Sequence, residues 1–250
     1  LLPSFPGGPK TSMAGLEDSV LFVGTGEGVW RSPDYGFTWK QMLKEQVIYT
    51  LHTAYNGTVL AGAVGKLFYS EDKGNTWTEI DVPTDFPVKS FASTSTGKYF
   101  FITGEFTNEE GYKGDGVFFN EGDLTTWTAR NTGINKIALH AEHITGDAYN
   151  RVYVGFADEY TTGNGGLFMS DNDGQQWQKI SLNIDGLGAI KTANVFSINA
   201  TPDDTLIYSV NGIITNFLVT LNLKKHRDDL QNTSPWKHMH VGSSSNWVLS

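Results

Sequence analysis

The chain has 250 residues and no cysteine, which excludes disulfide frameworks, iron–sulfur clusters, cysteine-based zinc sites and thiol nucleophiles. Its net charge of −9 repels nucleic-acid phosphates, so we expect no nucleic-acid partner. No apolar run reaches the roughly 18 residues that would predict insertion into a membrane. The 28 glycines and the 13% of aromatic residues are typical of many short strands joined by tight turns.

Five short apolar segments recur along the chain and predict one strand of a repeating unit. They cover residues 28–32, 66–70, 116–120, 166–170 and 216–220. Their starting points lie 38, 50, 50 and 50 residues apart. Periods of this length are typical of propellers, solenoids and arrays, in which each unit buries its faces against its neighbours.

Further β-rich runs accompany each of these segments. A run before each one predicts a preceding strand, at residues 20–23, 58–61, 99–102, 152–154 and 206–208. A tryptophan after each one opens a following strand, at Trp39, Trp77, Trp127, Trp177 and Trp236. One more run lies upstream and is clearest at 47–51 and 194–198. Each unit therefore has four predicted strands, A to D in chain order.

The connection between strands C and D carries a motif. Residues 32–39 and 70–77 both match S-x-D-x-G-x-T-W in full. The copy at 170–177 has Asn in place of Asp and Gln in place of Thr, and the copies after 120 and 220 are degenerate. The pattern closely resembles the Asp-box (BNR) repeat, and the resemblance covers nearly the whole chain.

This resemblance and the four-strand period predict an all-β fold, a β-propeller of four-stranded antiparallel blades. We expect one domain over residues 1–250 with five blades, or alternatively part of a six- or seven-bladed ring. The approximate blade boundaries are 11–43, 44–82, 83–131, 132–182 and 183–240, with 241–250 as a candidate closing strand.

The residues of the motif are expected to be structural rather than catalytic. An Asp in a tight turn accepts hydrogen bonds from nearby backbone N–H groups, Gly supplies a left-handed position, and Trp covers the apolar face of the blade. In families with this repeat the boxes lie on the outer edge of the blades, away from any ligand. The expected structural residues are Ser32, Asp34, Gly36, Trp39, Ser70, Asp72, Gly74, Trp77, Ser170, Gly174 and Trp177.

The lengths of the loops predict a ligand site on the face opposite the motif turns, where the B–C and D–A loops lie. The B–C connections of blades three and four are long, at 104–115 and 156–165, and adjacent blades would place them side by side. Acids and tyrosines gather in them: Glu105, Glu109, Glu110, Tyr112, Asp115, Asp158, Glu159 and Tyr160. Carboxylates and aromatic rings suit sugars, while a solvated, flexible loop pair remains the alternative.

The resemblance implies several activities. Sialidases, xyloglucan-active glycosidases, sortilin-type receptors and lectins all carry similar repeats. Sialidases clamp their substrate with three arginines, whereas this chain has four in all and only Arg130 is expected near the ligand-binding mouth. We therefore favour a non-catalytic, lectin-like binding or interaction propeller that recognises a glycan or a protein.

Two alternatives to this function and several minor signals stay open. A glycoside hydrolase using two of the loop carboxylates is the main alternative, and a structural repeat within a larger assembly is another. We expect no cofactor or resident metal, since the acids could hold calcium but form no calcium motif. His238 and His240 share a strand face and suggest only a weak metal site. We expect a secreted or extracytoplasmic protein, for which Asn56, Asn199 and Asn232 would permit glycosylation.

Overall fold

The computed structural model describes residues 10–44, 46–135, 139–157 and 165–180, and beyond residue 180 a set of strands between 183 and 242. All of the described elements are β-strands. No helix that could cross a membrane occurs in the part of the chain that the structure describes.

Twenty strands form five four-stranded antiparallel sheets. The first sheet holds β1 (Lys10–Gly15), β2 (Leu21–Thr25), β3 (Gly28–Ser32) and β4 (Lys40–Lys44), and the second holds β5 (Thr50–Thr53), β6 (Val59–Gly62), β7 (Lys66–Ser70) and β8 (Thr78–Asp81). The third holds β9 (Val88–Ser93), β10 (Tyr99–Thr103), β13 (Val117–Asn120) and β14 (Thr128–Ala129). The fourth holds β15 (Ala141–Gly146), β16 (Val152–Phe156), β17 (Gly166–Ser170) and β18 (Gln178–Ile180).

The fifth sheet holds β21 (Asn194–Ala200), β22 (Thr205–Asn211), β23 (Asn216–Asn222) and β24 (His240–Gly242). Within the predicted closing segment 241–250, residues 241 and 242 pair with Val219 and Leu218 of β23. Residues 243–250 and Trp236 lie outside the described residues. Two small ribbons complete the fold: β11 (Glu105–Thr107) with β12 (Gly111–Lys113), and β19 (Asn183–Ile184) with β20 (Gly188–Ala189).

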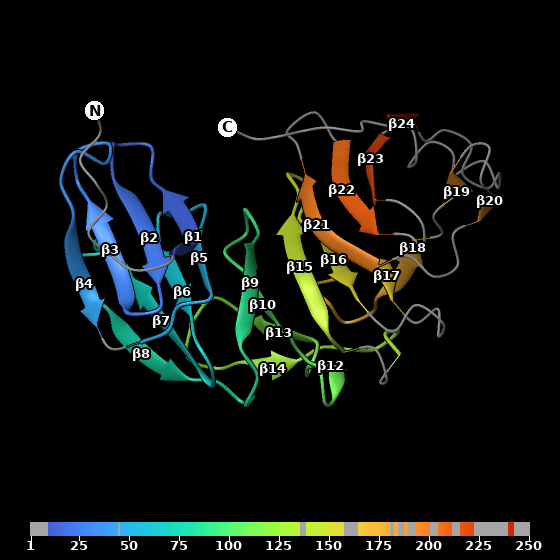
Figure 1. The fold of residues 1–250 in the computed structure, drawn as a ribbon, viewed down its shortest axis with the longest axis horizontal. Coiled ribbons are helices and arrows are strands. Elements are labelled where there is room, and N and C mark those ends of the chain that lie inside the picture. Colours follow the sequence, from blue (N-terminus) through green and yellow to red (C-terminus); the bar gives the residue numbers. More distant parts are fainter. Residues whose placement is uncertain are drawn as a thin grey trace.

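The five sheets follow one another in chain order around a common centre, from the blue first sheet to the orange fifth sheet (Figure 1). The first strand of each sheet is innermost, and successive innermost strands contact one another from β1 through β5, β9 and β15 to β21. The predicted all-β propeller of four-stranded antiparallel blades is confirmed. The predicted third strands at 28–32, 66–70 and 166–170 are β3, β7 and β17, residue for residue.

Where neighbouring sheets meet, a small residue of one sheet faces a larger residue of the other. In three sheets a glycine of the second strand lies against the innermost strand of the next sheet, or just before that strand, where an added Cβ would come within 2.9 Å of a side chain. These contacts join Gly24 with Ile48, Gly62 with Val88, and Gly155 with Val195. In the third sheet Ile102 takes the position that glycine has in the other three. The residue of the fourth sheet that corresponds to Val88 and Val195 is Ala141, and it shares a buried cluster with Ile102. A large residue on one side thus meets a small one on the other, which keeps the interfaces close-packed.

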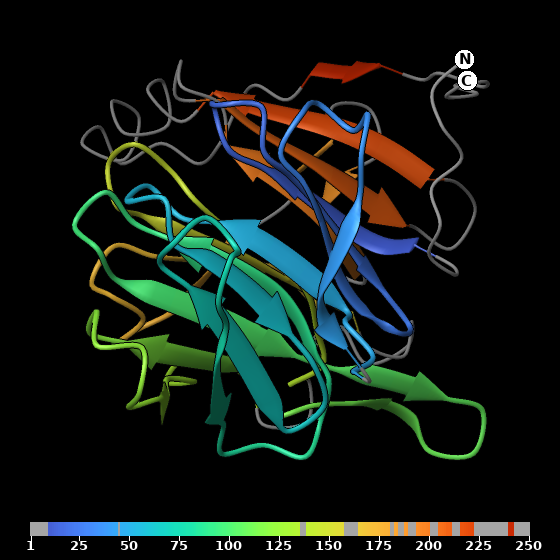
Figure 2. The same ribbon diagram turned by 90° about the vertical axis from the view of Figure 1, so that its left-hand side faces the viewer.

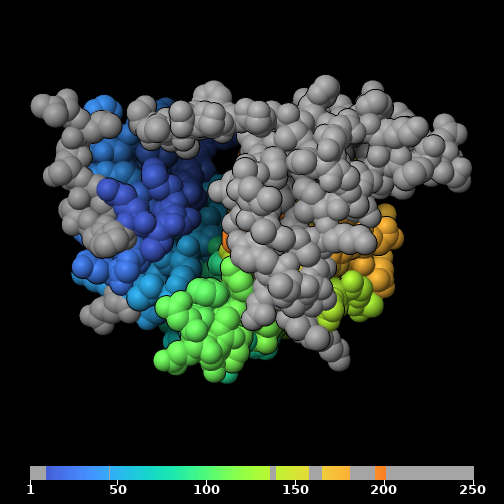
Figure 3. Space-filling view, turned by 45° about the vertical axis from the view of Figure 1, so that its right-hand side comes forward, coloured from blue at the N-terminus to red at the C-terminus, as the bar shows by residue number. Residues whose placement is uncertain are grey.

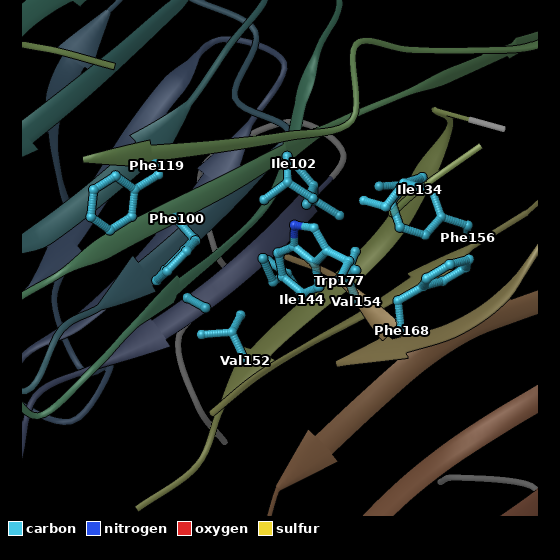
Figure 4. Packing of buried hydrophobic residues seen from close by; sticks show 13 residues of the cluster. Phe100, Ile102, Phe119, Ile134, Ile144, Val152, Val154, Phe156, Phe168 and Trp177 are labelled. Atoms are coloured by element: carbon cyan, nitrogen blue, oxygen red, sulfur yellow. The ribbon is translucent and has the colours of Figure 1, made fainter. Parts of the chain in front are cut away.

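Each motif tryptophan of the second to fourth sheets packs against the sheet that precedes it in the chain. Trp177 is 1% exposed and lies among Ile102, Ile144 and Val154 (Figure 4). Its Nε1 donates to the Arg130 carbonyl oxygen of the third sheet at 2.8 Å. The corresponding rings of the neighbouring sheets show the same arrangement: Trp77 meets Phe22 of the first sheet edge to face, and Trp127 shares a buried cluster with Leu60 and Leu67 of the second.

Candidate functional site

In the C–D turns, which join the third and fourth strands of a sheet, the acidic side chains accept hydrogen bonds from other residues of the same turn. In the first sheet Asp34 Oδ1 accepts hydrogen bonds from the Ser32 hydroxyl and the Thr38 backbone N–H, both at 2.8 Å. Asp34 Oδ2 accepts from the Thr38 hydroxyl at 2.7 Å. Gly36 has φ +89° and donates its N–H to Ser32 Oγ, and half-buried Trp39 closes the motif. Both carboxylate oxygens therefore hold the turn together.

The second sheet repeats this arrangement with Asp72. The backbone N–H and hydroxyl of Thr76 and the hydroxyl of Ser70 all donate to the carboxylate, and together they lower the pKa of Asp72 to about 2. Gly74 has φ +79°, and a Cβ there would lie 2.2 Å from the ring of Phe22 in the first sheet. Only glycine fits this position, because it combines a left-handed backbone with an inter-sheet contact.

Two variant turns keep the bonding pattern. In the fourth sheet Asn172 Oδ1 replaces the carboxylate and accepts from the Ser170 hydroxyl at 2.9 Å, while Gly174 donates its N–H to Ser170 Oγ. The third, degenerate copy has Gly122 at the position of the motif Asp, and Asp123, one position further along, accepts from the backbone N–H of Thr126. This bond, with others in the turn, lowers the pKa of Asp123 to about 2.

The long B–C connection of the third sheet folds into the β11–β12 hairpin. Phe106 and Tyr112 face each other across it, with ring centroids 4.8 Å apart. Figure 2 shows this hairpin, in green at the lower right, extending beyond the sheet, and in the space-filling view it forms part of the molecular surface (Figure 3). Phe106 is 56% exposed, although it is a large apolar residue.

The hairpin is held by the fourth sheet through His140. The ring of Tyr112 contacts the buried His140 ring edge to face at 4.9 Å, and His140 Nδ1 lies 3.0 Å from the Lys113 carbonyl oxygen. His140 Nε2 lies 2.6 Å from Glu142 Oε1. The two ring nitrogens thus face oxygen acceptors, and a ring protonated on both would donate to both.

Glu142 joins the third and fourth sheets. Its second carboxylate oxygen accepts a hydrogen bond from Lys89 Nζ of β9, and this ion pair is largely buried. Burial alone would raise the pKa of Glu142, but the hydrogen bonds from His140 and Lys89 and their charges outweigh it and lower that pKa. The carboxylate therefore stays charged and is held from two sides.

A β-bulge in the innermost strands sets the position of this pair. The ladder register skips one residue at the start of β9 and of β15, and the extra residues are Lys89 and Glu142. The same skip occurs in β1 and β21, where the extra residues are Thr11 and Phe196. A bulge re-aims a side chain and increases the local twist of a strand. The bulge therefore recurs at the start of the innermost strand in four of the five sheets, while β5 pairs with β6 without one.

The predicted site residues of the third sheet are only partly brought together. Glu105 lies opposite Lys113 in the hairpin, exposed Glu109 lies in its turn, and Glu110 pairs with Lys113 at 2.7 Å. Asp115 follows the hairpin, and its carboxylate accepts from the Thr84 hydroxyl at 2.7 Å. The predicted residues of the fourth-sheet loop lie outside the described part of the chain: Asp158, Glu159 and Tyr160.

The structure also corrects the expected position of Arg130. It was expected near the ligand-binding mouth, but its guanidinium donates to the Asp173 carbonyl oxygen in the C–D turn of the fourth sheet. The guanidinium also lies over the Phe119 ring, 3.4 Å from the centroid. Arg31 donates in the same way to the Lys73 carbonyl oxygen of the second sheet. Both arginines therefore connect adjacent sheets.

Four residues of this site were not predicted: Phe106, His140, Glu142 and Lys89. The alternation of β15 indicated that His140 and Glu142 share one side, but it could not show that Lys89 and Tyr112 reach them from another sheet. Among the residues that the structure describes, no three His, Asp or Glu side chains gather as a metal site.

Comparison with known proteins identifies the family of the chain and structures with a similar fold. Residues 2–216 match the profile of the DUF6242 beta propeller domain, and no curated protein matches the chain. An ancestral GH74 enzyme has a TM-score of 0.68 at 17% identity, over 90% of this chain and 31% of that one. YCF48 bound to D1 peptide has a TM-score of 0.59 at 13% identity, over 85% of this chain and 63% of that one.

The extracellular domain of BT4673 from B. thetaiotaomicron has a TM-score of 0.61 at 15% identity, over 87% of this chain and 27% of that one. The chain spans less than two thirds of the length of each of these three structures. At such identities the likeness shows the propeller fold, which hosts both enzymes and binding proteins.

Proposed function

Because the chain belongs to the family of DUF6242 beta propeller domains, we propose that it is a non-catalytic propeller that binds a glycan or a protein on the face opposite the C–D turns. The proposal places the protein outside the cytoplasm, as a secreted or extracytoplasmic domain. The extracellular domain of BT4673, which has the same fold, supports this placement.

The aromatic pair on the β11–β12 hairpin, exposed Phe106 and half-buried Tyr112, carries the proposal. The Phe106 ring packs against the Tyr112 ring at a tilted angle, and the Tyr112 ring contacts buried His140, so the exposed ring is supported by two others. A ring that is already ordered loses little conformational entropy when a ligand binds to it. The apolar face of a pyranose can stack on such a ring, which favours a glycan over a protein as the ligand.

Polar groups beside the rings would bind the hydroxyl groups of a sugar. Glu105 is partly exposed opposite Lys113, and the exposed Glu110–Lys113 pair lies at the end of the hairpin. A carboxylate accepts hydrogen bonds from hydroxyls and an ammonium donates to them. Aromatic stacking flanked by a few polar groups is the usual composition of a small-ligand site.

A glycan array followed by calorimetric titration of the best oligosaccharide tests this function. We expect Phe106→Ala and Tyr112→Ala each to weaken binding about tenfold, which corresponds to about 1.4 kcal/mol. Phe37→Ala is the matched control, because Phe37 is 61% exposed but lies in the C–D turn of the first sheet. Its binding should equal that of the unmodified protein.

Three outcomes would contradict the proposal. Absence of binding to every glycan would remove the glycan assignment, and an equal loss in Phe37→Ala would remove the hairpin from the site. Hydrolysis of the bound oligosaccharide would instead support the glycoside hydrolase alternative, with a carboxylate pair drawn from the predicted loop acids.

A further inference from the structure

A cavity of about 590 Å³ lies in the centre of the molecule, and it differs in location from the hairpin site. The innermost strands of all five sheets, β1, β5, β9, β15 and β21, contribute to its lining. Its volume falls within the range of small-molecule sites, roughly 300 to 1,000 Å³. The cavity is therefore large enough for a small molecule.

The cavity reaches the end of the sheets that carries the A–B turns. Its lining includes Ala54 and Tyr55, which follow β5 in the turn to β6. A smaller hollow of about 150 Å³ adjoins it and shares Ala54, Tyr55 and Ser93. Lys89 and Glu142, at the opposite ends of their strands, are not part of the cavity lining.

The described lining carries no acidic side chain and no lysine or arginine. Its polar side chains are hydroxyls, one asparagine amide, and the imidazoles of His52 and His143. Burial lowers the pKa of His52 to about 4, helped by the neighbouring His143, and burial also lowers the pKa of His143. At pH 7 both rings are neutral, and each offers one donor and one acceptor nitrogen.

This composition selects against charged ligands. An anion would find no cation in the described lining, and a cation would find no carboxylate there, so either would lose its hydration without compensation. A neutral ligand with several hydroxyl groups fits better, because hydroxyls both donate and accept. His52 Nε2 already lies 2.9 Å from Ser93 Oγ, and buried His143 Nδ1 has no hydrogen-bond partner among the described residues.

We propose that this cavity binds a small neutral polyhydroxylated molecule, a monosaccharide or a polyol, which enters past Tyr55. The side chain of Tyr55 is 64% exposed at the rim and offers an aromatic face to a sugar ring. The ligand contacts the hydroxyl and imidazole groups of the inner strands. This site lies at the other end of the sheets from the hairpin and does not rest on the function proposed above.

The test uses the whole chain with ¹⁵N-labelled histidine and three probes: glucose, xylose and inositol. At least one probe should bind with a Kd of about 1 mM or tighter and shift the imidazole resonances of His52 and His143. Glucuronate and glucosamine, which carry charges of opposite sign, should bind more weakly than glucose. This measurement needs no variant, so it does not depend on any mutant's folding.

Two variants locate the binding. Tyr55→Ala should weaken binding about fivefold to tenfold through loss of the ring face, and His143→Leu should weaken it at least tenfold. Tyr149→Ala is the matched control, since Tyr149 is 53% exposed in the A–B turn of the fourth sheet and is not among the lining residues. Unshifted histidine resonances with all three probes would overturn the proposal. Equal binding of the charged sugars, or unchanged affinity in both variants, would also overturn it.

Discussion

His52 shows how the centre of the molecule imposes a protonation state on one side chain. Its ring packs near Phe91, and its Nε2 contacts the Ser93 hydroxyl of the next sheet. Burial is the main reason that its pKa falls from 6.5 to about 4, and the second cause is its neighbour His143. The folded protein thus keeps this imidazole neutral at a pH where an unfolded chain would protonate it.

A pH titration of stability should reveal this difference. The folded-state pKa of His52 lies below the unfolded value, so the stabilisation is fully present above pH 6.5 and is lost as the pH falls toward 4. The free energy of unfolding should decrease by up to about 1.4 kcal/mol per pH unit for each proton that only the unfolded state binds. Urea unfolding across this range measures it, and His52→Gln should flatten the curve. A stability that rises as the pH falls from 6.5 to 4 would contradict the argument.

At the scale of the element, the β-bulges of β9 and β15 hold the two side chains that join the third and fourth sheets, Lys89 and Glu142. Glu142 is the extra residue of the bulge in β15, and Lys89 is the extra residue of the bulge in β9. The Glu142 carboxylate contacts both His140 of its own sheet and Lys89 of the third sheet. The bulge therefore converts a strand edge into a polar connection between two sheets.

The contribution of this connection to stability can be measured with the variant Glu142→Gln. The change leaves Lys89 and His140 without their carboxylate, so we expect a loss of about 1 to 3 kcal/mol in the free energy of unfolding. A double-mutant cycle with Lys89→Met should give a coupling energy above about 0.5 kcal/mol. The exposed Lys66–Glu79 pair is the matched control, and Glu79→Gln should cost less than about 1 kcal/mol. A smaller effect for Glu142→Gln than for Glu79→Gln would refute the stabilising role of the Glu142 carboxylate.

At the scale of the whole molecule, each sheet depends on its neighbours in the chain. Trp177 belongs to the fourth sheet but shares a buried cluster with Phe100, Ile102 and Phe119 of the third. Arg130 of the third sheet in turn reaches the C–D turn of the fourth. In repeat architectures of this kind, stability is approximately a sum of units and of the interfaces between neighbours.

Trp177→Ala should therefore act locally. Removal of a buried tryptophan is expected to cost about 3 to 5 kcal/mol. Hydrogen exchange should show protection lost in the third and fourth sheets while the first two sheets keep most of theirs. The control is Trp39→Ala, because Trp39 is only half-buried and should cost less. Uniform loss of protection across all sheets would show that the molecule unfolds as one cooperative unit.

Much of the fold could be predicted because it is encoded in short stretches of chain. The turn at 70–77 forms its bonds within eight residues, and the third strands were placed correctly from their apolar pattern. The degenerate third turn keeps the same kind of bonds, because Asp123 accepts them from a shifted position. The prediction located the hairpin residues Glu105 and Tyr112 but not the rings and charges around them.

The four-stranded repeat, its turns and the antiparallel all-β fold follow from the order of the residues, since the residues that produce these features are neighbours along the chain. Folding in three dimensions was needed to bring Lys89, Tyr112 and Glu142 around His140 and to place His52 and His143 in one central cavity. The reason is physical: these contacts depend on a one-residue bulge and on the packing of separate sheets. Neither leaves a periodic signal in the order of the residues.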